Sequence, residues 1–257
     1  MFDRLQKPFL TVETGEAYQP IRLSYHLHNK DKFIELFDTL QCIEKNPHGL
    51  TWSWYWKGEC DEIRFESLDS FKRNLEKPLR LGTITIKHNS LYISLPSFKR
   101  ACLAVPFFHK TIAQDIASVD HADFINKVFA LDERLPHGFT ELFKEKELEA
   151  IVNQRIEEYL KVEMQVEHAA TAEEALAILT DYTNSETKKR LPYAERYQFT
   201  NDGQDPDVVF LGFYIFLRGR ELVAIRRWFG ETGYTLSNLM DDTIEEIFGN
   251  MDIDLIE

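Results

Sequence analysis

The chain has 257 residues, of which 44% are hydrophobic and 28% charged, and its formal net charge is −13. This composition is typical of a folded globular protein and excludes disordered, collagen-like and fibrous proteins. The longest apolar run, Val208–Leu217, is half the length of the roughly 20 residues that a membrane-spanning helix requires, so we expect no membrane contact. The net negative charge argues against free nucleic acid as the main partner.

The N-terminus and the cysteines indicate the compartment. The first ten residues include three charged ones, and this composition does not match the apolar region of a secretory signal. The three cysteines are widely spaced and fit neither a disulfide framework nor a zinc site: Cys42, Cys60 and Cys102. We therefore predict a cytoplasmic protein with no cofactor and no bound metal.

The first part of the chain predicts a β-α-β-β-α-β order. Apolar residues alternate with polar ones at strand period or recur at helical spacing. The expected elements are a strand at 21–28, a helix at 31–44, a strand at 50–57, a strand at 61–66, a short helix at 68–75 and a strand at 79–87. This order is that of the ferredoxin-like arrangement, in which four antiparallel strands carry two helices on one face. A hairpin extension at 91–95 and a helix at 97–104 follow.

The second part of the chain predicts a helix-rich α+β region. The pattern indicates helices at 122–131, about 140–160, 172–182 and 236–248, short strands at 162–166 and 251–255, and a polar loop at 183–206. Two apolar segments, 208–217 and 222–228, predict an antiparallel hairpin that turns at Gly219. We expect an α+β protein with a ferredoxin-like domain at 1–114 and an acidic helical domain at 115–257, which could pack as one unit.

Charge is unevenly distributed along the chain. The segment from Ser70 to Lys110 contains eight basic residues and one acid, whereas the remainder carries −20. Such a segment either docks on the acidic part of the protein, is simply solvated, or faces an acidic partner, and the first two outcomes are the commoner ones. The residues that we predict to bind a partner are Lys72, Arg73, Lys77, Arg80, Lys87, Lys99 and Arg100.

A second candidate site lies on the first predicted strand. In a ferredoxin-like sheet, Arg22, His26 and His28 lie on the face that the helices leave open, and Tyr55 joins them from the next strand. His26 and His28 project to one side about 7 Å apart, a spacing that permits acid–base work or joint metal ligation. A solvated strand face is the commoner alternative, because no carboxylate or cysteine lies nearby in the sequence.

The aromatic residues favour a core over a nucleic-acid surface. Trp52, Trp54 and Trp56 alternate with polar residues, so we expect all three indoles to face inward, with a partner-binding surface as the alternative. The Lys/Arg-Gly-aromatic signature of RNA-recognition sheets is missing from the third predicted strand. Nucleic-acid binding therefore stays possible but is not favoured.

The motifs leave the function open. The sequence contains no glycine-rich phosphate loop, no Gly-x-Ser-x-Gly elbow and no His-Glu-x-x-His. We predict a non-enzymatic adaptor or regulatory protein that acts through electrostatically steered contacts with a protein partner. One alternative is a hydrolase or nucleic-acid-processing enzyme that uses the His26/His28 face, and another is an acidic nucleic-acid mimic that binds a basic protein. The oligomeric state does not follow from the sequence.

Overall fold

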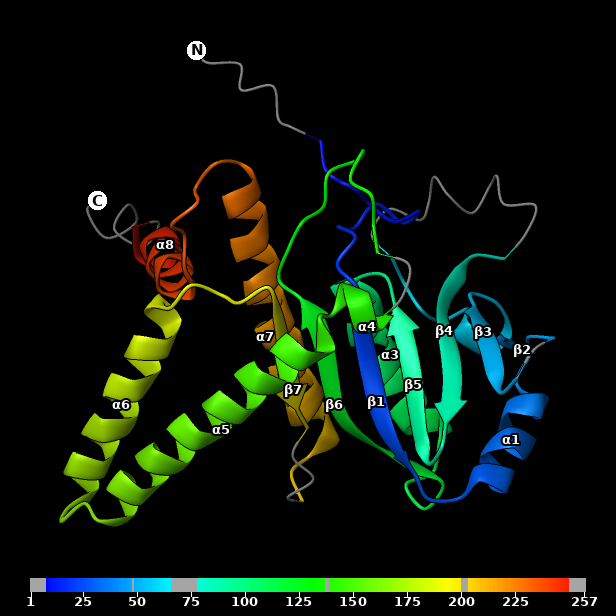
Figure 1. Ribbon diagram of the computed structural model, residues 1–257, viewed down its shortest axis with the longest axis horizontal. Coiled ribbons are helices and arrows are strands. Elements are labelled where there is room, and N and C mark those ends of the chain that lie inside the picture. The colour runs from blue at the N-terminus through cyan, green and yellow to red at the C-terminus, as the bar shows by residue number, and fades with distance from the viewer. Residues whose placement is uncertain (1–7, 48, 66–77, 137–138, 200–202, 250–257) are drawn as a thin grey trace, which may run out of the picture. The chain divides into compact units, whose positions relative to one another are not determined.

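The computed structural model describes residues 8–47, 49–65, 78–136, 139–199 and 203–249 (Figure 1). It shows an α+β protein with a seven-stranded antiparallel sheet. The strands are β1 (Ile21–Leu27), β2 (Ile43–Lys45), β3 (Thr51–Tyr55), β4 (Arg80–Lys87), β5 (Ser90–Leu95), β6 (Ala117–Ile125) and β7 (Ala194–Gln198). The helices are α1 (Lys30–Thr39), α3 (Phe98–Thr111), α4 (Phe139–Leu142), α5 (Glu145–Glu167), α6 (Ala172–Lys188), α7 (Pro206–Trp228) and α8 (Leu236–Gly249), with a short 3-10 turn at Gly58–Cys60. None of the described helices is long and apolar enough to cross a membrane.

The chain forms two compact units. The sheet unit comprises residues 8–135 and 196–217, and the helical unit comprises residues 136–195 and 218–249. The chain therefore leaves the sheet unit after β6 and returns to it at β7. The boundary predicted at 114/115 falls between α3 and β6, which both belong to the sheet unit.

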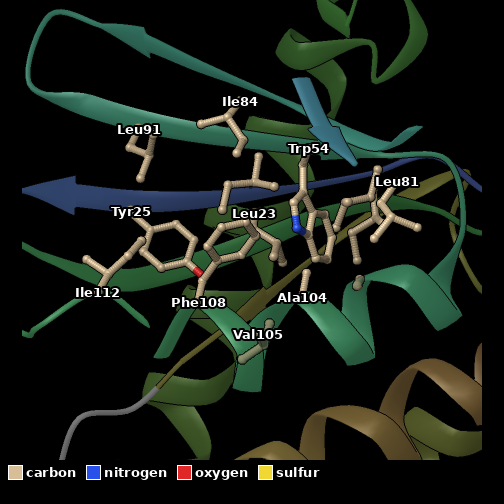
Figure 2. Packing of buried hydrophobic residues seen from close by; sticks show 14 of the residues in the cluster. Leu23, Tyr25, Trp54, Leu81, Ile84, Leu91, Ala104, Val105, Phe108 and Ile112 are labelled. Carbon is tan, nitrogen blue, oxygen red and sulfur yellow. The ribbon is translucent and has the colours of Figure 1, made fainter. Parts of the chain in front are cut away.

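The sheet unit has one apolar and one polar face. Strand order is β2-β3-β4-β5-β1-β6-β7. Ile21, Leu23, Tyr25 and Leu27 point to the apolar face, as the alternation in β1 predicts, and all four are buried. The three tryptophans of the 50–57 segment are also buried, which confirms that they belong to the core. Figure 2 shows side chains of α3, among them Val105 and Phe108, packed against this face.

The predicted ferredoxin-like topology is not confirmed. That arrangement would pair the strand at 80–87 with β1, but β1 lies between β5 and β6, and β4 pairs with β3 and β5. Residues 61–65 form a turn and extended chain without a strand, because the chain closes a 3-10 turn at Cys60 instead of a hairpin. The predicted helix at 68–75 lies outside the described residues. The β4–β5 hairpin agrees with the prediction.

Three elements of the second half were predicted wrongly. The hairpin expected from 208–217 and 222–228 is a single helix, α7, whose buried Phe213, Leu217 and Ala224 recur at spacings of four and seven residues, as on one face of a helix. Gly219 lies inside this helix, and a Cβ there would come within 3.3 Å of a methyl group of Leu236. Its role is therefore close packing of α7 and not a turn. The predicted helix at 122–131 is replaced by β6, which ends at Ile125.

The helical unit contains the third of these elements. The strand expected at 162–166 is the last part of α5, since no glycine or proline interrupts the helix before residue 167. The polar loop expected at 183–206 contains the end of α6 and all of β7. Two helices agree with the prediction: α6, whose N-cap Thr171 accepts a hydrogen bond from the amide of Glu174, and α8. The predicted strand at 251–255 lies outside the described residues.

A buried ion cluster stabilises the helical unit. The side chain of Glu195 is fully buried, and Arg220 of α7 donates to it through Nε at 2.9 Å. Arg155 of α5 donates to the same carboxylate. Burial raises the pKa of Glu195, but the two guanidinium groups outweigh this effect and hold it below its ordinary value. The carboxylate therefore stays charged and ties α5 and α7 to the strand residue.

Candidate functional site

The polar face of the sheet brings together β1, β5 and β6. Arg22, Ser24 and His26 of β1 point to it, since they alternate with the core residues of that strand. Their cross-strand partners on β5 are Ser94, Tyr92 and Ser90, and their partners on β6 are Asp123, His121 and Ser118. All nine side chains carry a polar group, and the charged pair Arg22–Asp123 links β1 to β6.

A β-bulge places an additional carboxylate on this face. Ser24 lies opposite His121 whereas Tyr25 lies opposite Val119, so Asp120 is an extra residue of β6 with no partner on β1. The bulge brings the Asp120 carboxylate to the side of the neighbouring imidazole, and Oδ2 lies 2.7 Å from Nδ1 of His121. Without the extra residue, the two adjacent side chains would point to opposite faces.

Asp123 is the buried centre of the charged network. Its carboxylate accepts hydrogen bonds from Arg196 Nε at 2.7 Å and from Arg22 Nη2 at 3.1 Å. The Nε2 atom of His121 lies 3.7 Å from the same carboxylate. Burial raises the pKa of Asp123, but His121 and Arg196 lower it by more, so the pKa lies well below its usual range. Asp123 is therefore ionised and joins β1, β6 and β7.

The part of the network that solvent reaches is a carboxylate–imidazole pair. Oδ1 of Asp120 accepts a hydrogen bond from Gln198 at 2.9 Å, and Nε2 of His26 lies 3.7 Å from the same oxygen. Burial raises the pKa of Asp120, and hydrogen bonds from His121 and Gln198 bring it below its ordinary value. The His26 side chain is 67% exposed, so its imidazole is accessible from the polar face.

The structure brings together only part of the predicted site. Arg22 and His26 share the network on β6, and the guanidinium of Arg22 lies 5.3 Å from the ring of Tyr92. His28 contacts Ser118 instead, with 2.9 Å between Nε2 and Oγ. Tyr55 lies on β3, and β4 and β5 separate it from β1. Across the described ranges, no group of three or more His, Cys, Asp or Glu side chains is placed to hold a metal ion.

The basic segment does not form one surface among the described residues. Arg80 and Lys87 are exposed on β4, and Lys99 is half-buried on α3. Arg100 is 1% exposed, so its charge lies in the interior. The other three predicted binding residues, Lys72, Arg73 and Lys77, lie outside the described residues.

Both terminal nitrogens of Arg100 are hydrogen-bonded within the sheet unit. Its Nη2 donates to Glu13 at 3.0 Å and to Thr14 at 3.1 Å, and its Nη1 donates to the carbonyl of Arg80 at 3.0 Å. The Nε atom lies 3.4 Å from the mostly buried carboxylate of Glu16. The guanidinium thus ties the N-terminal segment to β4 and α3, and it is unavailable to a partner.

Sequence reasoning missed the four residues that surround Arg22 and His26. The sequence pattern places Asp120 and His121 in a connecting region, Asp123 in the expected helix at 122–131, and Arg196 in a loop, whereas the structure places them on β6 and β7. The sequence does contain a signal for this strand. Apolar residues alternate at Ala117 and Val119, and the alternation resumes at Ala122 and Phe124 after a shift of one residue. Polar residues between such apolar positions indicate a strand with a bulge.

The helical unit exposes an apolar surface. Six large side chains on α5 and α6 are between 42% and 64% exposed: Ile156, Tyr159, Leu160, Met164, Leu176 and Leu179. We call this set the apolar flank. Of all the residues in these two helices, only Leu148 is buried.

Comparison with known proteins does not connect either surface to a family. No protein-family model, curated protein or solved structure matches the chain.

Proposed function

We propose that the protein is a non-enzymatic adaptor or regulatory protein that binds a basic, amphipathic protein partner through α5 and α6. The observation that carries the proposal is the apolar flank on two helices that bury a single residue. Helices in proteins gain most of their stability by burying an apolar face. An apolar face that is left exposed on such helices is typical of an interaction site.

Helical geometry supports one continuous surface. Glu158 on α5 accepts a hydrogen bond from Lys189, directly after α6, so the two helices form an antiparallel pair joined by a short turn. Ile156 follows the half-buried Arg155, and Leu176 follows the half-buried Ala175, by one position each. Successive side chains of a helix differ in direction by about 100° around the helix axis. If Arg155 and Ala175 face the neighbouring helix, the residue that follows each of them points to the same side of the antiparallel pair.

Charge complementarity supports the chemistry of the partner. Between Glu145 and Lys188 the chain has eleven acidic and four basic residues, a net of −7. A partner helix could place its apolar side on the apolar flank. Basic residues on the other side of the partner helix would then face the acidic residues of α5 and α6 and would steer association. The proposal therefore shifts the contact surface from the basic segment to the acidic helices. A reducing cytoplasm, where the three free cysteines persist, is the expected compartment.

A synthetic amphipathic peptide with leucine on one face and lysine on the other tests this proposal. We expect it to bind the full chain in fluorescence anisotropy, and the double variant Leu160→Ser, Leu176→Ser to bind about tenfold more weakly. Leu131→Ser is the matched control, because this leucine is 59% exposed on the sheet unit. A matched peptide with glutamate in place of lysine should not bind. Equal affinity of the wild-type chain and the double variant would contradict the proposal.

The acidic nucleic-acid mimic is separated from the adaptor by the same experiment. A mimic presents charge alone, so its binding to a basic partner would vanish at high salt and would not depend on leucine. Binding that persists at high salt and is lost in the double variant supports the adaptor. The opposite pair of results supports the mimic.

The His26 face carries a second candidate function, because the structure adds Asp120 and His121 to it. A carboxylate that orients an imidazole is an arrangement suited to general acid–base catalysis, as a hydrolase or nucleic-acid-processing enzyme requires. The test is hydrolysis of nitrophenyl ester and phosphoester substrates by the purified chain. This candidate requires a measurable rate that the double variant His26→Ala, His28→Ala loses while it remains folded. No rate, or a rate that this variant retains, excludes it.

A further inference from the structure

The first three turns of α7 are apolar on two sides. No residue from Val208 to Leu217 is charged, and Phe213 and Leu217 are buried in the core of the sheet unit. Val208, Leu211 and Ile215 are nevertheless between 57% and 61% exposed. A helix that is apolar all round is normally buried on every side. None of the described helices is suited to cross a membrane, so a protein surface is the cover that we consider for this side of α7.

The three exposed residues form one stripe, which we call the α7 stripe: Val208, Leu211 and Ile215. Their spacing of three and then four residues returns to the same side of a helix, as in helices that pack in pairs. Successive residues are about 100° apart, so the stripe lies about 180° from the side that carries Phe213 and Leu217. It is therefore the side of α7 that points away from the core.

Opposite charges lie at the two ends of the α7 stripe. Asp207 precedes it in the first turn of α7, and Arg218 follows Ile215 by three residues on the same uninterrupted helix. Asp207 and Arg218 are eleven residues apart, about three helical turns, so they point to nearly the same side. Asp207 is exposed, and the Arg218 side chain is 49% exposed although it donates to Glu221. The stripe is therefore acidic at its start and basic at its end.

We propose that the α7 stripe is the interface of a homodimer, in which the α7 helices of two copies pack antiparallel about a two-fold axis. In this arrangement Leu211 of one copy contacts Ile215 of the other, and Asp207 of one copy lies beside Arg218 of the other. Each contact occurs twice, as in two-fold dimers, which are the commonest oligomers. A parallel pair would instead bring Asp207 beside Asp207, and this like-charge contact disfavours it.

The charges favour a second copy over the basic helix that we propose for the apolar flank. The α7 stripe has one charge of each sign at its ends, so it is complementary to itself, whereas the acidic helices α5 and α6 are not. The face from Asp207 to Arg218 is only about 18 Å long, and a pair of such faces buries less than the roughly 800 Å² per partner of a standard interface. We therefore expect a weak dimer, with a dissociation constant of about 10–100 µM.

Sedimentation equilibrium of the full chain, at concentrations from about 1 µM to about 300 µM, measures the dimer. In Leu211→Ser the dissociation constant should rise at least about tenfold. Leu131→Ser is the matched control, because this leucine is 59% exposed elsewhere on the sheet unit, and it should dimerise as the wild-type chain does. The flank variant Leu160→Ser, Leu176→Ser should also dimerise normally. The dimer is therefore independent of the adaptor proposal, and either proposal can fail alone.

Charge reversal tests the antiparallel arrangement. Asp207→Lys and Arg218→Glu should each raise the dissociation constant about fivefold, because each reversal places like charges together twice in the dimer. The chain that carries both reversals restores the complementarity, so its dissociation constant should return to within about twofold of the wild-type value. Circular dichroism checks that every variant remains folded at the temperature of the measurement.

Four results would overturn the proposal. A chain that stays monomeric throughout this concentration range would show that the α7 stripe is not covered by a second copy. Dimerisation that is unchanged in Leu211→Ser, or that is lost in the flank variant instead, would place the interface elsewhere. Single charge reversals without effect, or a double reversal that does not recover the wild-type affinity, would exclude the antiparallel pair.

Discussion

Replacing Arg100 by methionine should destabilise the sheet unit strongly, although the sequence places this arginine in a basic surface segment. The guanidinium is 1% exposed and donates to two side chains and two backbone carbonyls. Methionine retains the apolar stem and fills most of the space, so the substitution mainly removes the charge and its hydrogen bonds.

The magnitude follows from what remains behind. Glu16 is 9% exposed in its side chain and would lose the cation 3.4 Å away, while the carbonyl of Arg80 would lose its donor. Removing one member of a buried ion pair costs about 3–5 kcal/mol. Glu13 is 61% exposed and can be hydrated again, so we take the lower limit, about 3 kcal/mol. For a chain of this length, that loss lowers the melting temperature by roughly 6–12 °C.

Urea unfolding followed by tryptophan fluorescence measures the effect. Trp52 and Trp54 are buried in the sheet unit and therefore report on the unit that contains Arg100. Lys87→Met is the matched control, because Lys87 is exposed and its loss should change the free energy of unfolding by less than about 0.5 kcal/mol. In Arg100→Met, Glu16→Gln, part of the lost stability should return, since the stranded carboxylate is gone.

A loss below about 1 kcal/mol in Arg100→Met, or a loss equal to that in Lys87→Met, would refute this reasoning. The guanidinium would then be solvated rather than buried. Charge reversal at Lys87, Lys99 and Arg100 together would in that case be a fair test of a basic binding surface. If Arg100→Met is unstable, only the two lysines can be reversed without disturbing the fold.

Three further predictions concern other buried groups. Asp123→Asn should lower stability at pH 7. The difference from the wild-type chain should begin to shrink as the pH falls below about 4, the pKa of an unfolded aspartate, and should vanish only below the lowered pKa of the folded protein, because the carboxylate stabilises the fold only while it is ionised; a difference that is constant with pH would contradict this. The pKa of Cys42 is raised by its hydrogen bond with the neighbouring thiol and by burial, so iodoacetamide followed by mass spectrometry should modify the partly exposed Cys102 and leave Cys42 intact until the protein unfolds. Arg220→Met should cost about 1.5–3 kcal/mol in the helical unit, measured by circular dichroism, since the buried Glu195 loses one of its guanidinium partners while Arg155 remains; an unchanged transition would show that the charge is not buried.

The elements that the sequence predicts correctly are those in which one pattern runs without interruption. β1 alternates over seven residues, and β4 and β5 alternate on both sides of a two-residue turn at His88 and Asn89. Thr171 and Glu174 mark the start of α6 independently of its apolar pattern. In each case local propensity and burial require the same structure.

The wrong elements are those in which a short pattern permits two structures. The run Val208–Leu217 is apolar at every position, so strand and helix periodicity fit equally well. The outcome depends on residues further along α7, where Arg220 and Ala224 continue the helical face of Phe213 and Leu217. The Asp120 bulge shifts the alternation of β6 by one residue. The pattern therefore did not indicate a strand there, and Asp120, His121 and Asp123 were not placed beside Arg22 and His26.

The two units obtain their stability in different ways, and this difference bears on the adaptor proposal. The sheet unit buries whole strand faces together with α3, whereas α5 and α6 bury one leucine and otherwise depend on the contact of Arg155 with Glu195 and on surface pairs such as Glu158 with Lys189. Surface pairs contribute at most about 1 kcal/mol each. The two helices therefore belong to the less stable part of the protein, where local opening is easiest. A partner that covers the apolar flank would stabilise this part by mass action and leave the sheet unit unchanged. Regulation through α5 and α6 thus requires no movement of the sheet.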